Sequence, residues 1–187
     1  MPLLAVEPCI QPESLLDHPP IGTDGGSQFW VLHTRPRSEK ALARVFLERG
    51  MSYFLPTYRR EWRKNGRQFR SYLPLFPGYI FLHGSHDERS TALETNLVAT
   101  VIPVRDQLQL HADLFRVHRL IQSGAPVTPE EMLEPGDPVS IVRGPLAGLD
   151  GIILQRGKNL KFVIEVRMLG RAVAAEVQNW MLEAVSG

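Results

Sequence analysis

The chain has 187 residues and a formal net charge of +1, with 43% hydrophobic and 22% charged residues. This composition is typical of a soluble globular protein of one or two domains, and no apolar run approaches the roughly 20 residues that span a bilayer. The N-terminus lacks the features of a secretory signal, the single cysteine excludes an internal disulfide, and no Cys/His cluster has zinc-site spacing. We therefore expect a monomeric cytoplasmic protein with no membrane contact, no metal and no cofactor.

Residues 1–27 are rich in proline and glycine, and no apolar period in them lasts long enough to build an element. The sequence predicts a mostly disordered tail there. The β-forming run at residues 29–33 predicts the first core strand. A helix is predicted over about 39–49, with Ser38 as its N-cap and Gly50 as its left-handed C-cap.

Strands are predicted at 53–62 and 67–75, joined at Asn65-Gly66, which is a strong hairpin signal. Residues 59–70 hold six bases and one acid, so this short segment carries +5. One interpretation is a solvated tip that charge keeps soluble. The other is a nucleic-acid contact, in which basic groups meet phosphates and interleaved aromatic rings stack on bases. The candidate contact residues are Arg60, Arg63, Lys64 and Arg67.

The run Leu73-Pro74-Leu75-Phe76-Pro77-Gly78-Tyr79-Ile80-Phe81 places two prolines and a glycine among large apolar residues. Proline is expelled from central strands and glycine permits unusual backbone angles, so a kinked strand is predicted. The apolar residues exceed what one buried strand face needs, which favours rings that point outward toward a partner. A kinked strand that is buried on both faces remains the alternative.

A short helix at 87–94, a strand at 97–104 and a helical stripe from Leu110 to Ile121 complete an antiparallel sheet with helices packed on it, an α+β fold. Residues 123–133 are predicted to be a linker. From residue 134, short alternating segments predict a small five-stranded all-β barrel. The expected organisation is a tail (1–27), an N-terminal domain (28–122), a linker (123–133) and a barrel (134–187).

Sequence motifs of catalysis were not found: the chain has no G-x-S-x-G, no phosphate-binding Walker loop and no H-E-x-x-H. The six histidines are scattered, and the acids lie mainly in tails, linkers and expected helix surfaces. We therefore expect that the protein is not an enzyme.

Two motifs resemble one known family. The first run, Phe29 to Thr34, together with Leu75-Phe76-Pro77-Gly78-Tyr79-Ile80-Phe81, resembles the N-terminal domain of the NusG family of transcription elongation factors. The segments 136–141 and 144–152 are similar to that family's C-terminal KOW barrel. The resemblance covers about residues 28–185. Leu146 stands where the family commonly has Phe, and the long tail and basic hairpin look more like specialised antiterminators of the RfaH and UpxY types.

The resemblance implies an elongation and antitermination factor that docks on the clamp helices of RNA polymerase and suppresses pausing and termination. It places the docking patch at His33, Phe76, Pro77, Tyr79 and Phe81, with Ser90 and Thr91 near the opposite wall of the cleft. Arg35 and Arg37 become candidates for contact with the non-template DNA strand. The barrel would recruit the ribosome or the termination factor Rho through turn residues Leu146 and Leu149. The alternative is a ribosome-associated or RNA-binding KOW protein that never meets polymerase.

Overall fold

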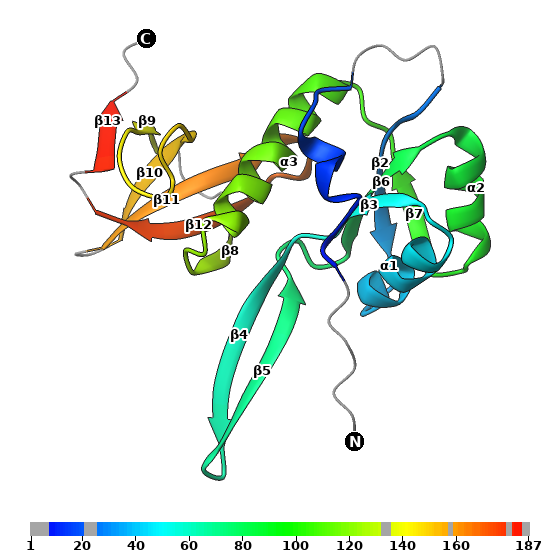
Figure 1. Cartoon of the computed structure of the whole chain (residues 1–187), viewed down its shortest axis with the longest axis horizontal. Coiled ribbons are helices and arrows are strands. Elements are labelled where there is room, and N and C mark those ends of the chain that lie inside the picture. The colour runs from blue at the N-terminus through cyan, green and yellow to red at the C-terminus, as the bar shows by residue number, and fades with distance from the viewer. Residues whose placement is uncertain (1–7, 21–25, 132–135, 157–158, 179–180, 185–187) are drawn as a thin grey trace. The chain divides into compact units, whose positions relative to one another are not determined.

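The computed structural model describes residues 8–20, 26–131, 136–156, 159–178 and 181–184. The chain divides into two compact units, residues 1–111 and 112–187. The predicted α+β class is confirmed, with an antiparallel sheet and helices in the first unit and an all-β sheet in the second (Figure 1).

The first unit is built on a five-stranded antiparallel sheet with the strand order β1-β3-β6-β2-β7. Its strands are β1 (Ile10–Gln11), β2 (Gln28–Thr34), β3 (Ser52–Phe54), β6 (Tyr79–Gly84) and β7 (Val98–Ile102). The helices are η1 (Glu13–Leu16), α1 (Glu39–Glu48) and α2 (His86–Glu94), and the helix α3 (Gln107–Gln122) crosses the boundary between the units.

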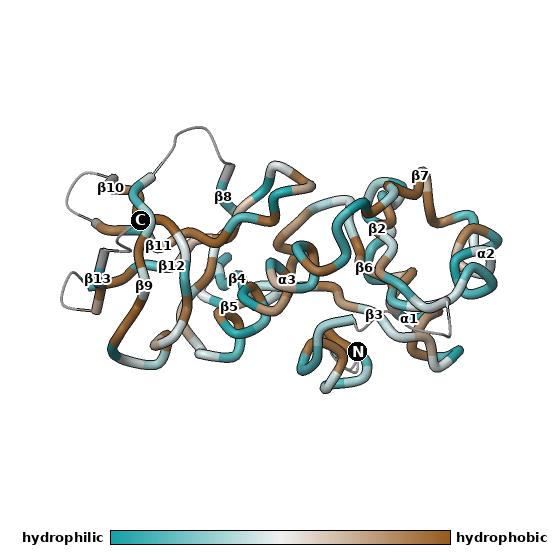
Figure 2. Tube along the Cα trace, turned by 90° about the horizontal axis from the view of Figure 1, so that it is seen from above, coloured by the Kyte–Doolittle hydropathy of each residue, from teal (hydrophilic) through white to brown (hydrophobic). Residues whose placement is uncertain are grey.

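Helix α1 covers one face of this sheet. Its Leu42 and Phe46 form a core cluster with Leu32 of β2 and with Ile80 and Leu82 of β6, all fully buried. These apolar residues recur at helical spacing in α1 and at alternate positions in the strands, so burying them fixes both elements. Helix α2, by contrast, is largely drawn in hydrophilic colours in Figure 2, and Ala92 is its buried residue.

The N-terminal segment is more ordered than its composition predicts. Ile10 and Gln11 pair with Phe54 and Tyr53 at the β3 edge of the sheet, and Leu16 of η1 is fully buried. The prediction of a disordered tail is therefore wrong for residues 8–20. Short-range pattern reasoning missed this because two apolar side chains and an edge strand of two residues leave almost no periodic signal.

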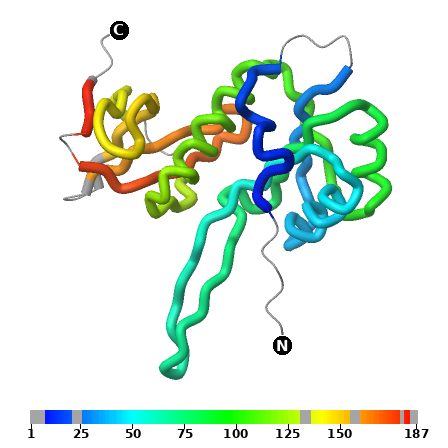
Figure 3. The backbone as a smooth tube through the Cα atoms, viewed as in Figure 1, coloured from blue at the N-terminus to red at the C-terminus, as the bar shows by residue number. Residues whose placement is uncertain are grey.

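A two-stranded ribbon leaves the first unit between β3 and β6. Strands β4 (Thr57–Lys64) and β5 (Arg67–Pro74) pair only with each other in the sheets of the described residues. Figure 3 shows the chain running out along β4 and returning along β5. The Asn65-Gly66 turn occurs as predicted, with positive φ at both residues (50° and 74°). The single strand predicted over 53–62 is divided into β3 and β4 at Leu55-Pro56.

The second unit contains a six-stranded antiparallel sheet with the order β13-β9-β10-β11-β12-β8. The strands are β8 (Val127–Glu131), β9 (Asp137–Ile141), β10 (Asp150–Arg156), β11 (Asn159–Val166), β12 (Arg171–Val177) and β13 (Leu182–Ala184), with the short helix η2 (Arg167–Leu169) before β12. The predicted linker is thus wrong for residues 127–131, which form the sixth strand. Trp180 lies outside the described residues.

The division into units also differs from the predicted domain boundary. Residues 112–122, assigned from the sequence to the N-terminal domain, belong to the second compact unit. No helix among the described residues is long and apolar enough to cross a membrane.

Candidate functional site

The kink predicted in the first unit is a tight turn held by backbone hydrogen bonds. The Tyr79 amide donates to the Phe76 carbonyl at 3.0 Å, and the Thr34 amide donates to the Gly78 carbonyl at 2.8 Å. Gly78 has φ of +86°, and a Cβ there would lie 3.2 Å from Nε2 of His33. Glycine is therefore favoured by the backbone angle, and a larger residue would also crowd the histidine ring.

A buried carboxylate locks this turn to helix α1. Glu39 is 7% exposed, and its Oε1 accepts a 2.7 Å hydrogen bond from the Gly78 amide. Charge-assisted hydrogen bonds of this kind are the stronger ones, and leaving the carboxylate unpartnered would be costly. Sequence reasoning treated Glu39 only as a first-turn residue of the helix, because no local pattern announces a partner 39 positions away.

Two of the predicted docking rings are interior residues. Phe81 is 0% exposed and Phe76 is 1% exposed, and they meet edge to face at 6.2 Å between ring centroids. Phe54 also packs on Phe81, at 6.3 Å. The prediction that these rings point outward is wrong for Phe76 and Phe81. Alternation along β6 puts Phe81 on the sheet face opposite α1, where Phe54 and Phe76 pack against it.

The outer side of the kink carries the remaining predicted residues. His33 and Pro77 are exposed and Tyr79 is half-buried. His33 and Tyr79 are cross-strand partners, and their ring centroids lie 5.1 Å apart. We call these three residues the kink surface. It presents an amphipathic aromatic pair beside a rigid turn, which is the kind of group that anchors protein interfaces.

The other residues predicted for the first unit lie on different elements. Arg35 and Arg37 are exposed in the loop after β2, where Arg37 adopts a positive φ of 61°. Ser90 and Thr91 lie on α2, and the Ser90 hydroxyl donates to the His86 carbonyl at 2.9 Å. The loop arginines follow directly after the strand that carries His33. Among the described contacts, none joins the side chain of Ser90 or Thr91 to the kink.

The ribbon of β4 and β5 exposes every residue from 59 to 70. Trp62 and Phe69 are each 41% exposed and stack on one another, with centroids 5.7 Å apart and planes 16° from parallel. The predicted basic residues Arg60, Arg63, Lys64 and Arg67 all lie on this ribbon. It therefore combines positive charge with exposed ring surface.

The predicted partner-binding residues of the second unit are buried. Leu146 and Leu149 are each 2% exposed, and the Leu149 amide donates to the Leu146 carbonyl at 3.2 Å within the turn. The prediction that these leucines form an exposed apolar patch is wrong, because the turn folds them inward. Val142, which is 40% exposed, is an apolar surface residue of the same region.

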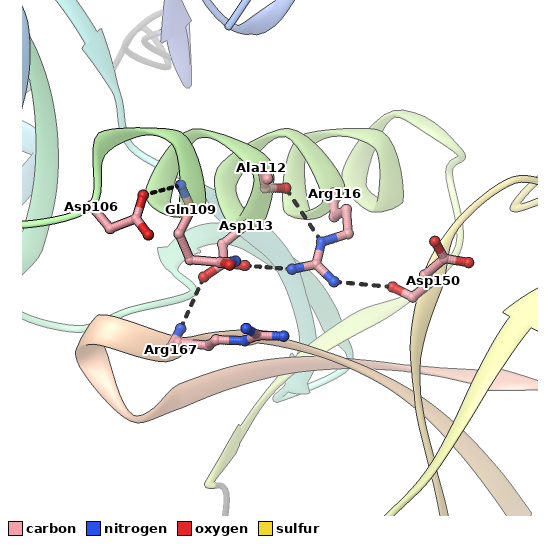
Figure 4. Close-up of polar contacts among 7 residues, drawn as sticks. All are labelled: Asp106, Gln109, Ala112, Asp113, Arg116, Asp150 and Arg167. Atoms are coloured by element: carbon pink, nitrogen blue, oxygen red, sulfur yellow. Dashed lines mark hydrogen bonds and ion pairs between the residues drawn. The ribbon is translucent and has the colours of Figure 1, made fainter. Parts of the chain in front are cut away.

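A polar cluster in the second unit was not expected from the sequence (Figure 4). Asp113 is 1% exposed; one carboxylate oxygen pairs with Arg116 and the other accepts a 3.1 Å hydrogen bond from the Arg167 amide. Arg116 also donates to the Asp150 carbonyl at 3.4 Å. Arg116, Asp150 and Arg167 line a cavity of about 350 Å³ together with Ser140 and Glu165. Asp113 thus joins α3 to the start of η2 within the second unit.

Burial shifts the pKa of three titratable groups in the first unit. Desolvation is the main cause that lowers the pKa of His83 and of His111, and it raises the pKa of the Cys9 thiol. Both histidine rings pack near Phe29, at 4.8 and 6.2 Å. Among the described residues, no group of three His, Cys, Asp or Glu side chains is arranged to hold a metal ion.

Comparisons with known proteins agree on one family. A family model described as "Transcription termination factor nusG" matches residues 27–133. A Pseudomonas aeruginosa protein named "Transcription termination/antitermination protein NusG" is 25% identical over 178 residues, covering 84% of this chain and 98% of that protein. A solved structure described as "Domain interaction in Thermotoga maritima NusG" has a TM-score of 0.51 and 18% identity, and the match covers 86% of this chain and 98% of that one.

Proposed function

The chain belongs to the NusG family of transcription termination/antitermination factors, since the family model matches more than half of it, and we propose that it binds RNA polymerase through the kink surface. Members of this family are transcription factors. The observation that carries the proposal is the pairing of an exposed His33 with Tyr79 on a turn that Glu39 and Gly78 hold rigid. A rigid aromatic surface loses little conformational entropy when a partner covers it.

The occupant of the kink surface would be the helical tip of the polymerase clamp. An amphipathic helix docks by laying apolar side chains against a preformed surface, and a few anchor residues then carry most of the binding energy. Arg35 and Arg37, which follow the same strand, would contact the non-template DNA strand, since guanidinium groups pair with phosphates. Ser90 and Thr91 would touch the opposite wall of the cleft.

Bridging the cleft would favour the closed clamp. A factor that binds the closed state more tightly than the open state shifts the population toward closure by the difference in its binding free energies. Closure disfavours pausing, so the proposed consequence is suppression of pausing and termination. The second unit would recruit a second partner, the ribosome or Rho, with Val142 as an exposed apolar contact.

Co-purification with core RNA polymerase tests the docking proposal. The double variant His33→Ala with Tyr79→Ala removes the kink surface and leaves Phe76 and Phe81 in the core. We expect a loss of about 2 kcal/mol or more, which corresponds to a roughly 30-fold rise in Kd. The matched control is His18→Ala with Tyr72→Ala, which removes one histidine and one tyrosine from other surfaces. Equal binding by the kink-surface variant and the parent would remove the docking proposal.

A further inference from the structure

The two faces of the β4–β5 ribbon are chemically different, and the strand register shows how. Successive residues of a strand point to opposite faces, and cross-strand partners share a face. Trp62 is paired with Phe69 and Lys64 with Arg67, whereas Glu61 is paired with Arg70 and Arg63 with Gln68. One face, here called the Trp62 face, therefore carries Arg60, Trp62, Lys64, Arg67 and Phe69. The other, the Glu61 face, carries Arg59, Glu61, Arg63, Gln68 and Arg70.

The side-chain contacts agree with this assignment. Trp62 stacks on Phe69 across the ribbon. Glu61 accepts from Gln68 at 3.3 Å and pairs with Arg59 at 3.2 Å. Each set of contacts stays within one face, so the register and the side chains describe the same separation.

The faces carry equal numbers of bases but differ in the position of the acid and of the stacked ring pair. Each has three basic side chains, and the only acid of the ribbon, Glu61, lies on its own face and is engaged there by Arg59 and Gln68. The Trp62 face thus has three positive charges and no carboxylate, with an aromatic pair between the base at residue 60 and the two bases at the tip. A polyanion would meet uncompensated charge on this face and partly compensated charge on the other.

We propose that the Trp62 face is a binding site for single-stranded nucleic acid, in which a base stacks on the Trp62–Phe69 pair and Arg60, Lys64 and Arg67 contact the flanking phosphates. This inference deepens the proposed function and rests on its assumption that the protein works on a nucleic-acid complex. Arg60 and Lys64 are four residues apart on one strand, about 14 Å at the usual rise, with Trp62 midway. A base on the ring pair therefore has a cation on either side along the strand.

A single strand suits this surface better than a duplex does. A two-stranded ribbon can enter the major groove, but duplex bases are already stacked on one another and offer no free ring face. Unpaired bases stack on aromatic side chains, and every base has such a face, so recognition is tolerant of sequence. The exposed ring pair would be unused in a duplex complex.

The aromatic pair also supports the ribbon itself. An isolated two-stranded ribbon is marginally stable in water, and an aromatic cross-strand pair adds to its stability. This structural role alone would not require the one acid of the ribbon to lie on the opposite face. It does mean that the test must separate loss of binding from loss of the ribbon.

The experiment uses the full chain and two matched triple variants. The first is Arg60→Gln, Lys64→Gln, Arg67→Gln on the Trp62 face; the second is Arg59→Gln, Arg63→Gln, Arg70→Gln on the Glu61 face. Both remove three charges, so the overall field changes equally. Fluorescence anisotropy measures binding to labelled oligothymidylate, to oligouridylate and to a duplex of equal length, between about 50 and 200 mM salt.

For the Trp62-face triple variant, we expect the slope of log K against log salt to become shallower by about 0.7 for each phosphate that is no longer neutralised, so by about 2 in total. The Glu61-face triple variant should leave this slope nearly unchanged. Trp62→Leu should weaken binding about 5- to 150-fold, the range expected when one base no longer stacks on a ring. Trp62→Phe, which keeps a ring and the cross-strand pair, should restore most of it. The oligothymidylate and oligouridylate arms show whether the strand is DNA or RNA.

Equal losses in the two triples, or a preference for the duplex, would overturn the inference and leave polymerase docking untouched. Retention of binding in Trp62→Leu would also overturn it, because stacking would then contribute nothing. Absence of binding to any oligonucleotide would overturn both this inference and the nucleic-acid role of the ribbon, while co-purification with polymerase still reports on the kink surface separately.

Discussion

The kink at residues 73–81 and the ribbon at residues 57–74 adjoin in the chain and are both rich in aromatic and apolar residues, but the fold treats their rings in opposite ways. Phe76 and Phe81 are enclosed by the first unit's sheet, whereas Trp62 and Phe69 are 41% exposed. The difference comes from what covers each strand. Strand β6 lies between β3 and β2 in the sheet, while β4 and β5 pair only with each other in the part of the chain that the structure describes. An aromatic-rich run therefore indicates that rings are present, but the elements packed around them decide whether a partner can reach those rings.

Truncating one ring from each region should give the largest contrast. Phe81→Ala is expected to reduce the free energy of unfolding by about 3–5 kcal/mol, because it leaves a cavity in a packed core. Phe69→Ala removes an exposed ring and should cost less than about 1 kcal/mol. Urea denaturation followed by intrinsic fluorescence measures both, since Trp30 reports on the first unit's core. Similar costs for the two substitutions would contradict the difference in burial.

The second largest contrast in stability should come from removing one carboxylate from each region. Glu39→Ala leaves the Gly78 amide without its acceptor and is expected to cost about 1–3 kcal/mol. Glu61→Ala breaks an exposed ion pair with Arg59 and should cost between 0 and about 1 kcal/mol. The same denaturation measurement applies. A Glu61 variant as unstable as the Glu39 variant would mean that the ribbon is more tightly integrated than its pairing indicates.

Glycine substitutions sharpen the comparison further. Gly78→Ala and Gly66→Ala both force alanine into a positive φ, at a cost of roughly 1–2 kcal/mol where the backbone cannot relax. At Gly78 the added Cβ would also crowd His33, whereas at Gly66 it would meet nothing within 4 Å. We expect Gly78→Ala to lower global stability and to weaken polymerase binding, and Gly66→Ala to change either by little because the turn of the ribbon absorbs the strain. Unchanged polymerase binding by Gly78→Ala would count against a rigid kink surface.

The smallest expected effect concerns pH. Burial lowers the pKa of His83 and His111, so between their folded values and about 6.5 the unfolded chain binds more protons than the folded chain. Stability should therefore fall as pH decreases below about 6.5 and level off below the folded values. The double variant His83→Gln with His111→Gln should show a shallower dependence between pH 7.5 and 5.5 than the control His18→Gln. The ribbon contains no histidine. Identical pH profiles for both variants would contradict the role of buried histidine.

The sequence predicted the elements whose signal is local. The Asn65-Gly66 turn, helix α1 and the alternating strand β11 follow from turn chemistry and periodicity, and the structure confirms the α+β fold. What it could not predict depends on contacts between distant segments. The edge strand β1 exists because Ile10 pairs with Phe54, and the sixth strand β8 exists because it pairs with β12. No short-range pattern encodes either pairing.

In the candidate site, too, local sequence signals predicted some residues, and contacts between distant segments decided the rest. The family resemblance pointed to His33 and Tyr79, and charge pointed to the basic ribbon; His33 and the ribbon are exposed, and Tyr79 is half-buried. The same reasoning placed Phe76, Phe81, Leu146 and Leu149 outward, and each is buried. It also missed Glu39 and Asp113, because a buried acid is recognisable only from the partner that it meets.

The central claim is that this protein has two separable surfaces, the kink surface for polymerase and the Trp62 face for a single strand. The most direct test measures, in parallel, binding to core RNA polymerase free of nucleic acid and binding to oligothymidylate. Two separable surfaces predict that His33→Ala with Tyr79→Ala loses the first and keeps the second, and that Arg60→Gln, Lys64→Gln, Arg67→Gln does the reverse. Loss of both activities in both variants, with the fold intact, would contradict this claim.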